Sequence, residues 1–315
     1  MNAIELFPRA PNSALESLAE QAAKFAEAAR ARSTRRAYTS DVRDFEEFCA
    51  AHALPFLPSS PETIAFYITH LASRVTVSTI RRRLAAITYA HRERGFESPA
   101  TPRRHFVVRE VLAGIKRTLG VAQQGAPPLL GNAIRRIVDA CPGNLLGTRD
   151  RALVLLGFAA GSRRSELTSI LEVRDLTFSD RGLYIMLRRS KTDQEKTGRV
   201  VAIPVGEHAE WLEAAHITSG PVFRAVDRHG NVSATALSAR SVSKILKHAA
   251  ARAGMDSQRV SPHGLRAGMA TQAAINGAEE REIARITGHR SVAVLRSYVR
   301  EADLYRNNAS GRLGL

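Results

Sequence analysis

Apolar side chains recur every three or four positions through the first 120 residues, which is the spacing of one face of an α-helix. They are Tyr38, Val42, Phe45 and Phe48 in one segment and Ile80, Leu84 and Ile87 in a later one. Residues 13–30 are rich in Ala and Glu, and a further helical segment extends to about Leu119. We therefore predict that this part of the chain is built from helices alone.

Capping residues indicate where these helices begin and end. Ser33 or Thr34 is a good N-cap for the first apolar segment, and the Ser-Pro-Glu run at 60–62 is a strong start signal for the next helix. Gly95 ends the helix that contains the second segment. In that helix Arg81–Arg83 lie off the apolar face, so we expect all three to be exposed.

The pattern changes after Gly120–Leu130, a stretch with Gly, Gln and a Pro pair and without periodicity. Helical spacing returns at about 131–140 and 148–160. Residues 183–191 and 199–206 then alternate in polarity or are β-branched, and the polar segment between them predicts a hairpin. The remainder of the chain has helical patterns again.

These changes predict two domains, a division that also suits a length of 315 residues. We place a helical domain at 1–122, with 1–12 flexible, and a linker at 123–129. The second domain, at 130–315, is a mixed α+β domain with a small antiparallel sheet. The predicted class of the whole chain is mainly α.

Basic side chains exceed acidic ones in both predicted domains. The chain has 46 Lys and Arg against 30 Asp and Glu, a formal net charge of +16. A polyanionic partner explains such an excess, and nucleic acid fits better than a membrane because no basic amphipathic anchor or lipidation signal is present. An ordinary basic surface is the alternative.

Several classes of protein are excluded by what the sequence lacks. Cys49 and Cys141 are the only cysteines, far apart and without paired histidines, which argues against a disulfide framework or a zinc site and fits a reducing cytoplasm. No glycine-rich phosphate-binding motif and no apolar run of membrane-spanning length occur. The first residues lack the features of a signal peptide. We expect no metal, no cofactor and no membrane contact.

A few polar side chains are candidates for chemistry, although each has an ordinary structural explanation. They are His263, Arg266, His289, Tyr298, Lys191 and Lys196. The first two share a helix face, as a surface pair does. The tyrosine lies on a face with apolar neighbours, as a core tyrosine does, and the lysines lie at the hairpin tip, where solvent exposure is expected.

The segment "GSRRSEL" places two arginines side by side. Arg163 has the spacing of a helical ion pair with Glu166. The apolar side chains Leu167, Ile170 and Leu171 define the buried face, and Arg163 lies nearer its middle than Arg164 does. This spacing favours Arg163 over Arg164 as the inward arginine.

Together, two arginines, a lysine, two histidines and a tyrosine suit phosphoryl transfer without a metal ion. The attack on a phosphodiester needs a nucleophile, positive charge on the non-bridging oxygens and a proton for the leaving oxygen. Arginine binds phosphate oxygens in bidentate fashion, whereas lysine acts as a point charge.

The same motifs resemble those of the tyrosine recombinases, the phage integrase family, and most closely its simple two-domain, Cre-like members. The boxes are "GSRRSEL" followed by "VRDL", then "RSKTD", "HGLR" and "GHRSVAVLRSY", in this order and with the family's spacing. The segments "STRRAYTSDVRDFEEFC" and "TVSTIRRRL" match the amino-terminal half. The resemblance extends from about Ser33 to Tyr298 and implies a SAM-like core-binding domain followed by a catalytic domain.

The resemblance implies a role for each site residue. Tyr298 would attack DNA and form a 3′-phosphotyrosyl link, and Arg163 and Arg266 would bind the scissile phosphate. The remaining roles fall to Lys191 as the acid for the leaving oxygen, His263 as an acid or base, His289 as a hydrogen-bond partner of a non-bridging oxygen and Glu166 as the residue that orients Arg163. Tyr305 is a rival nucleophile that misses the spacing. No metal or ATP would be needed.

The resemblance also implies partners. Double-stranded DNA with an inverted-repeat site would bind at Arg36, Ser40, Thr79, Arg81 and Arg82. Four copies of the protein would assemble on synapsed DNA, with or without accessory or directionality factors. The tail at 301–315 would dock on a neighbouring copy or remain frayed. We expect the protein to be located in the bacterial cytoplasm in association with the nucleoid. A mobile element or a phage is the expected source of its gene.

Two other functions remain open from the sequence. A topoisomerase of type IB would use the same nucleophile as a monomer and relax DNA without exchange between sites. A protein that binds DNA without cleaving it is the other.

Overall fold

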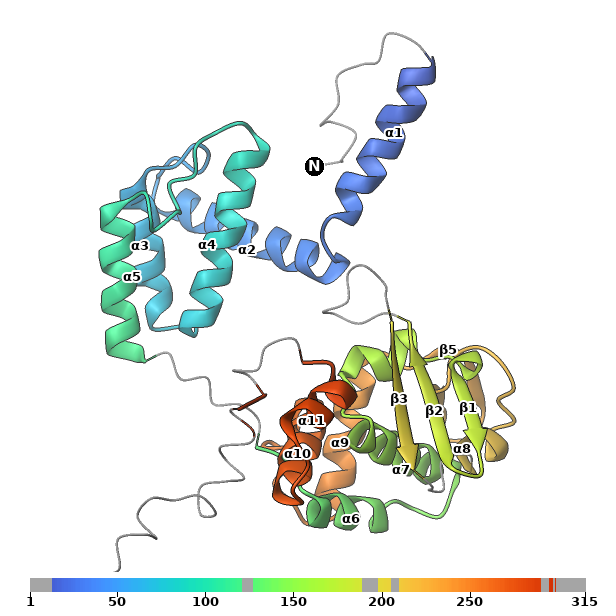
Figure 1. The fold of residues 1–315 in the computed structure, drawn as a ribbon. Coiled ribbons are helices and arrows are strands. Elements are labelled where there is room, and N and C mark those ends of the chain that lie inside the picture. The colour runs from blue at the N-terminus through green and yellow to red at the C-terminus, as the bar shows by residue number, and fades with distance from the viewer. Residues whose placement is uncertain are drawn as a thin grey trace, which may run out of the picture. The chain divides into compact units, whose positions relative to one another are not determined.

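The protein, seen in a computed structural model, forms two compact units, Met1–Gln123 and Gln124–Leu315 (Figure 1). The structure describes residues 13–120, 127–188, 198–204, 210–289, 295–296 and 298. The predicted flexible start at 1–12 and residues 123–126 of the predicted linker lie outside these ranges. Residues 127–129 lie against helix α10 (Pro262–Ile275) of the second unit, where the Leu129 N–H donates to the Gly264 carbonyl at 2.9 Å.

Within its described residues, the first unit consists of helices and the loops between them. The helices are α1 (Ser13–Ala28), α2 (Arg32–Ala51), α3 (Pro61–Ala72), α4 (Val77–Glu93) and α5 (Phe106–Leu119). α2 packs against α4 and α3 against α5. The predicted apolar positions Phe45, Ile80, Leu84 and Ile87 are buried in one core with Tyr67.

The observed start agrees with the predicted start for α3 but not for α2. The Ser60 side chain accepts the Thr63 N–H, and Pro61 occupies the first turn of α3, as predicted. The N-cap prediction for α2 is wrong: the helix begins at Arg32, and its N-cap Ala31 has no side-chain hydrogen bond. An ion pair between Arg35 and Glu27 joins this first turn to α1, which favours the earlier start.

The prediction that Arg81–Arg83 are all exposed is wrong for Arg83. Its side chain is only 14% exposed and forms an ion pair with Asp44. It also donates to the Tyr67 hydroxyl at 2.9 Å. The charge is tolerated because a carboxylate and a phenol accept its N–H groups. Arg81 and Arg82 are exposed.

His91 is fully buried where α4 meets the loop before α3. Its Nδ1–H donates to the Ile87 carbonyl at 2.9 Å, so its Nε2 accepts the Ser59 N–H at 3.1 Å. This arrangement needs a neutral ring. Burial lowers the pKa of His91 below its ordinary 6.5.

We expect His91 to make the first unit less stable in acid. The unfolded chain takes up a proton near pH 6.5 while the folded ring resists it, so stability is full above pH 6.5 and falls as the pH decreases toward the lower folded pKa. Hydrogen–deuterium exchange of peptides from α3 and α4, corrected for intrinsic rates, measures this. In a His91→Gln variant the pH dependence should flatten. An unchanged slope in the variant would contradict the prediction.

The second unit contains helices and two small sheets in its described residues. Its elements are α6 (Gly131–Asp139), α7 (Leu145–Ala159), the π-helical turn η2 (Glu166–Ile170), the 3₁₀ turn η3 (Val173–Asp175), β1 (Leu176–Ser179), β2 (Gly182–Leu187), β3 (Arg199–Pro204), α8 (Glu210–Ala214), β4 (Arg224–Val226), β5 (Val232–Ala236), α9 (Ala239–Arg252), α10 (Pro262–Ile275) and α11 (Glu280–Thr287). One antiparallel sheet has the strand order β1-β2-β3, and β4 and β5 form a second, two-stranded antiparallel sheet.

The predicted class, mainly helical with a small antiparallel sheet in the second unit, is confirmed. The hairpin is present as β2 and β3, in the register Gly182↔Pro204 to Leu187↔Arg199. β1, β4, β5 and α8 were not predicted, since strands and helices of three to five residues are too short to show a period. α7 begins before the predicted residue 148 because the Asn144 side chain caps it by accepting the Gly147 N–H at 3.0 Å.

The sheet supports the region that holds the candidate residues. One face of β2 and β3 packs on α7, η2 and Trp211 in a single core. α11 packs against β3, and α10 against both α7 and α11 (Figure 1). Among the described residues, no helix is both long and apolar enough to cross a membrane.

Candidate active site

Six of the predicted catalytic and supporting residues lie close together in the second unit, where η2, β3, α10 and α11 meet. They are Arg163, Glu166, His263, Arg266, His289 and Tyr298. Lys191, the predicted acid, and Lys196 lie outside the described residues. So do Tyr305 and the predicted docking tail at 301–315.

Arg163 enters the site just after α7 ends. Its Nη1 donates to Glu166 Oε1 at 2.9 Å, and its backbone N–H donates to Glu166 Oε2 at 2.9 Å. The Arg163 side chain is 17% exposed, whereas Arg164 is exposed and donates to the Ser243 hydroxyl. Of the two neighbouring arginines, Arg163 is the inward one, as the apolar spacing predicts.

Gly161 makes the turn between α7 and Arg163 possible. Its φ is +52°, and a Cβ at this position would lie 2.9 Å from Thr287 Cγ2 at the end of α11. Its carbonyl accepts Nη1 of Arg266 at 2.7 Å. The same turn therefore brings the end of α11 and the Arg266 guanidinium to Arg163.

α10 presents His263 and Arg266 from adjacent turns. The helix starts with Ser261 as N-cap and Pro262 in its first turn. Arg266 is buried, and its Nη2 hydrogen-bonds to none of the described residues. Burial and the nearby charge of Arg163 lower the pKa of Arg266 to about 10, so it stays charged at neutral pH. Desolvation and the Arg266 charge also lower the pKa of His263.

Tyr298 reaches the two histidines from the end of the described chain. Its Oη lies 3.1 Å from His263 Nε2, and its ring centroid lies 5.8 Å from that of His289. Burial raises the pKa of Tyr298, and the charge of Arg266 opposes this rise. The hydroxyl is therefore protonated at neutral pH and lies beside a neutral imidazole that can take its proton.

His289 is held with its proton on Nδ1. The Thr287 hydroxyl donates to the Ile283 carbonyl at 2.6 Å, so it accepts the His289 Nδ1–H at 2.8 Å. Burial and the charges of Arg266 and Arg163 lower the pKa of His289 to about 4. Its Nε2 therefore carries no proton at neutral pH.

Arg199, at the start of β3, also belongs to the site, and sequence reasoning missed it. Its side chain is 16% exposed, and its Nη2 donates to Glu166 Oε2 at 3.1 Å. Its Nη1 donates to the Ile286 carbonyl near the end of α11. The one signal in the sequence is a charge at the first position of an otherwise apolar strand.

The site has more positive than negative charge. In the described part of the site, Arg163, Arg199 and Arg266 are largely buried around one carboxylate, Glu166, which is 0% exposed. Buried charge without a counter-ion is unfavourable, so this arrangement favours binding of an anion. Among the described residues, no group of three or more His, Cys, Asp or Glu side chains could hold a metal ion.

The first unit holds the residues predicted to contact DNA. Arg36, Ser40 and Arg81 are exposed and Thr79 is half-buried. Arg82 is 48% exposed and donates from Nε and Nη2 to the buried carboxylate of Asp41, at 2.8 Å each. An arginine held in this way has little rotational freedom while its edge stays accessible.

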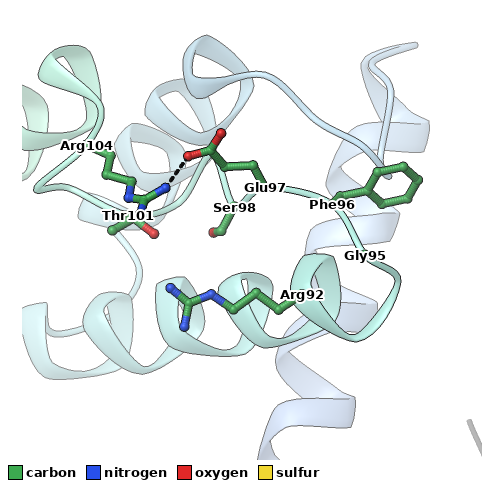
Figure 2. Close-up of a pocket in the computed structure, with 7 residues that line it drawn as sticks. All are labelled: Arg92, Gly95, Phe96, Glu97, Ser98, Thr101 and Arg104. Atoms are coloured by element: carbon green, nitrogen blue, oxygen red, sulfur yellow. Dashed lines mark hydrogen bonds and ion pairs between the residues drawn. The ribbon is translucent and has the colours of Figure 1, made fainter. Parts of the chain in front are cut away.

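Two hollows lie next to each other beside α4. The first, of about 340 Å³, is lined by Arg92, Ser98, Thr101 and the ion pair Glu97–Arg104 (Figure 2). In Figure 2 the Arg92 side chain extends from α4 below Thr101, and Phe96 points away.

The second hollow, of about 490 Å³, shares Arg92 and Thr101 with the first. Arg81, Arg103 and Lys116 also line it, and none of its described lining residues is acidic. Four positive charges around one hollow form a candidate contact for a polyanion.

Comparison with known proteins covers both units. Residues 128–304 match the phage integrase family, and residues 25–93 match the phage integrase N-terminal SAM-like domain. An integrase/recombinase described as a xerD homolog from Selenomonas ruminantium is 36% identical over 308 residues, covering 95% of this chain and 90% of the relative. The tyrosine recombinase XerD of Agrobacterium fabrum is 27% identical over 304 residues, covering 87% and 86%.

Solved structures share the fold at lower sequence identity. The Tn1549 transposon integrase in complex with transposon right end DNA has a TM-score of 0.57 at 14% identity, covering 88% of this chain and 94% of that one. A lambda integrase dimer bound to a COC′ core site has a TM-score of 0.53 at 16% identity, covering 86% and 72%.

Proposed function

The chain belongs to the phage integrase family and is a tyrosine site-specific recombinase, and on this premise we propose that it breaks and rejoins DNA through a covalent bond between Tyr298 and the 3′ end of the cleaved strand. One observation carries the proposal: the Tyr298 hydroxyl lies 3.1 Å from His263 Nε2, next to the buried Arg266. A nucleophile, a base and a phosphate-binding cation thus lie together.

In the proposed step one bond to phosphorus forms and another breaks, and one proton is transferred with each of these changes. Tyr298 Oη bonds to phosphorus, its proton passes to His263 Nε2, and the bond from phosphorus to the 5′ oxygen breaks. Lys191, outside the described residues, is the proposed donor of the proton that the leaving oxygen takes. Attack by a 5′-hydroxyl on the tyrosyl ester reverses the step and reforms a DNA strand.

Charge stabilisation comes from the arginines. Arg163 extends into the site from the segment between α7 and η2, and Arg266 extends from α10. Arg266 Nη2 has no partner among the described residues. Fixed cations of this kind stabilise the charge that develops on the non-bridging oxygens. The tyrosyl ester retains the energy of the broken bond, so we propose that neither ATP nor a metal ion is needed.

His289 can donate to a phosphate oxygen only after it gains a proton on Nε2, since its Nδ1–H is bound to Thr287. In the structure burial lowers the pKa of His289 to about 4, together with the charges of Arg266 and Arg163. A bound phosphodiester brings a negative charge that offsets them. We propose that DNA binding raises this pKa and that the histidine then donates to the phosphate.

The recombinase also needs to hold its DNA site, and we propose that the first unit does so. Arg36, Ser40, Thr79 and Arg82 are the proposed contacts on α2 and α4. Exchange between two duplexes requires cleavage of two strands in each round, so we propose that four copies assemble on two inverted-repeat sites. The bound site itself is identified by recovering bound and cleaved fragments from a random DNA pool.

The covalent step is tested with a nicked suicide substrate that contains the recovered site. Wild-type protein should accumulate a protein–DNA adduct, because the short fragment after the nick diffuses away and religation stops. Mass spectrometry of the digested adduct should find a nucleotide on the peptide that contains Tyr298. Relaxation of plasmid without exchange between two sites would instead support a topoisomerase.

The hollow lined by Arg81 and Arg92 should bind DNA phosphates. We expect Arg81→Gln with Arg92→Gln to weaken binding equally for all sequences and to reduce the slope of log K against log salt by about 2, roughly one for each arginine that is removed from a phosphate. Fluorescence anisotropy over a salt series measures both. The control Glu97→Gln with Arg104→Gln removes a pair that is already neutral and should leave the slope unchanged. An equal change in both double variants would contradict the prediction.

A further inference from the structure

Arg199 connects three segments of the site although it lies on a strand. Its Nη2 donates to Glu166 on η2, and its Nη1 donates to the Ile286 carbonyl in the last turn of α11. β3, which it begins, is the arm of the hairpin that follows residues 189–197, which include Lys191. One guanidinium thus joins η2 and α11 to the hairpin.

Glu166 needs Arg199 to keep its geometry. The carboxylate is 0% exposed, and Arg163 binds it through Nη1 on Oε1 and through the backbone N–H on Oε2. Arg199 adds a charged donor on Oε2 at 3.1 Å. With Oε2 occupied in this way, Oε1 holds the Arg163 guanidinium in one orientation. Without Arg199, Arg163 would be the one donor to both oxygens of this buried anion among the described residues whose bonds to it are given above.

Arg199 also fixes the segment that leads to His289. Gly288 ends α11 with a φ of +66°, and a Cβ there would lie 3.1 to 3.2 Å from Nε, Cδ and Cζ of Arg199. The backbone thus packs directly on the guanidinium. The Gly288 carbonyl faces Nη2 of Arg163 at 3.5 Å, so the same segment contacts both arginines.

We propose that Arg199 is a positioning residue: it holds Glu166 and the end of α11 so that Arg163 and His289 meet the scissile phosphate in a reactive geometry. The inference rests on the proposed function, because it assumes cleavage by Tyr298. Arg199 itself is not placed on the phosphate.

The burial of Arg199 is unfavourable, which indicates a specific use. Its Nε is buried and bonds to none of the described residues, and desolvation lowers its pKa. A lysine would supply the charge but not the fork that spans a carboxylate and a carbonyl. Charge alone and geometry therefore predict different results for Arg199→Lys.

The test compares Arg199→Lys and Arg199→Met with wild type in single-turnover cleavage of the suicide substrate. We expect both variants to bind the site within about twofold of wild type and to cleave it about 100-fold more slowly, since a displacement near 1 Å at a reacting centre has an effect of this size. Arg181→Ala is the matched control. This exposed arginine lies in the β1–β2 turn, at the end of the sheet opposite to Arg199, so the variant should cleave at the wild-type rate.

A double-mutant cycle with Glu166→Gln separates positioning from stability. If Arg199 acts through Glu166, the slowing by Arg199→Lys should shrink in the Glu166→Gln background, and thermal unfolding should not follow the same pattern. A wild-type cleavage rate in Arg199→Lys overturns the inference, as do full additivity in the cycle and an equal loss of binding and cleavage. If wild-type protein forms no adduct, the proposed function fails instead.

Discussion

Replacing Tyr298 with phenylalanine is expected to abolish the covalent protein–DNA adduct while DNA binding stays within about twofold of wild type. The change removes only the hydroxyl that lies 3.1 Å from His263, and the ring keeps its place beside His289. Without the nucleophile, neither the ester nor strand exchange can form, so cleavage should fall by on the order of 10⁴-fold or more. Gel separation of the adduct under denaturing conditions measures the loss, and anisotropy measures binding.

Tyr305→Phe is the matched control for this experiment. Tyr305 follows seven positions later in the chain and is the rival nucleophile, outside the described residues. We expect this variant to form the adduct at the wild-type rate. Loss of the adduct in Tyr305→Phe, together with an undiminished adduct in Tyr298→Phe, would move the nucleophile to Tyr305 and refute the proposed mechanism.

The family and the fold class were predictable because the motifs occur in a fixed order. Each motif combines a polar residue with its local helical context, for example "HGLR" at the start of a helix that begins with Ser-Pro. Local spacing also favours an inward Arg163, since Leu167 and Leu171 are buried, and the resemblance to the family motif supplies the assignment. The residues in each of these patterns lie within one or two helical turns of each other, so their spacing in the sequence shows which of them share a helix face.

Interactions between distant segments were not predictable from spacing. Arg199 reads as the polar start of a strand, and only the packing of α11 on β3 brings it to Glu166 and Ile286. In the first unit, Arg83 reads as a solvent-exposed charge, yet Asp44 and Tyr67 of the same unit accept its N–H groups. Partners separated by 16 to 87 residues leave no periodic trace in the chain.

Arg163→Ala is also expected to cause a large loss of cleavage rate. The substitution removes a cation from the site but leaves Glu166 its bond to Arg199, so we expect the protein to fold. Because the variant lacks one of the two arginines proposed to bind the scissile phosphate, cleavage of the suicide substrate should slow by about 10²- to 10³-fold, the usual effect of removing a preorganised donor. Binding of the whole site should change little, because the contacts proposed for the first unit are left intact.

Arg164→Ala provides the control one position away. Arg164 is exposed and donates to the Ser243 hydroxyl rather than into the site, so its loss should leave both cleavage and binding within about twofold of wild type. The two variants remove the same side chain from adjacent residues, and they differ only in the direction in which it points. Equal slowing in both would show that the positive charge of the segment matters and not the inward arginine. Slowing only in Arg163→Ala, with unchanged binding, ties the rate to the guanidinium that Glu166 holds.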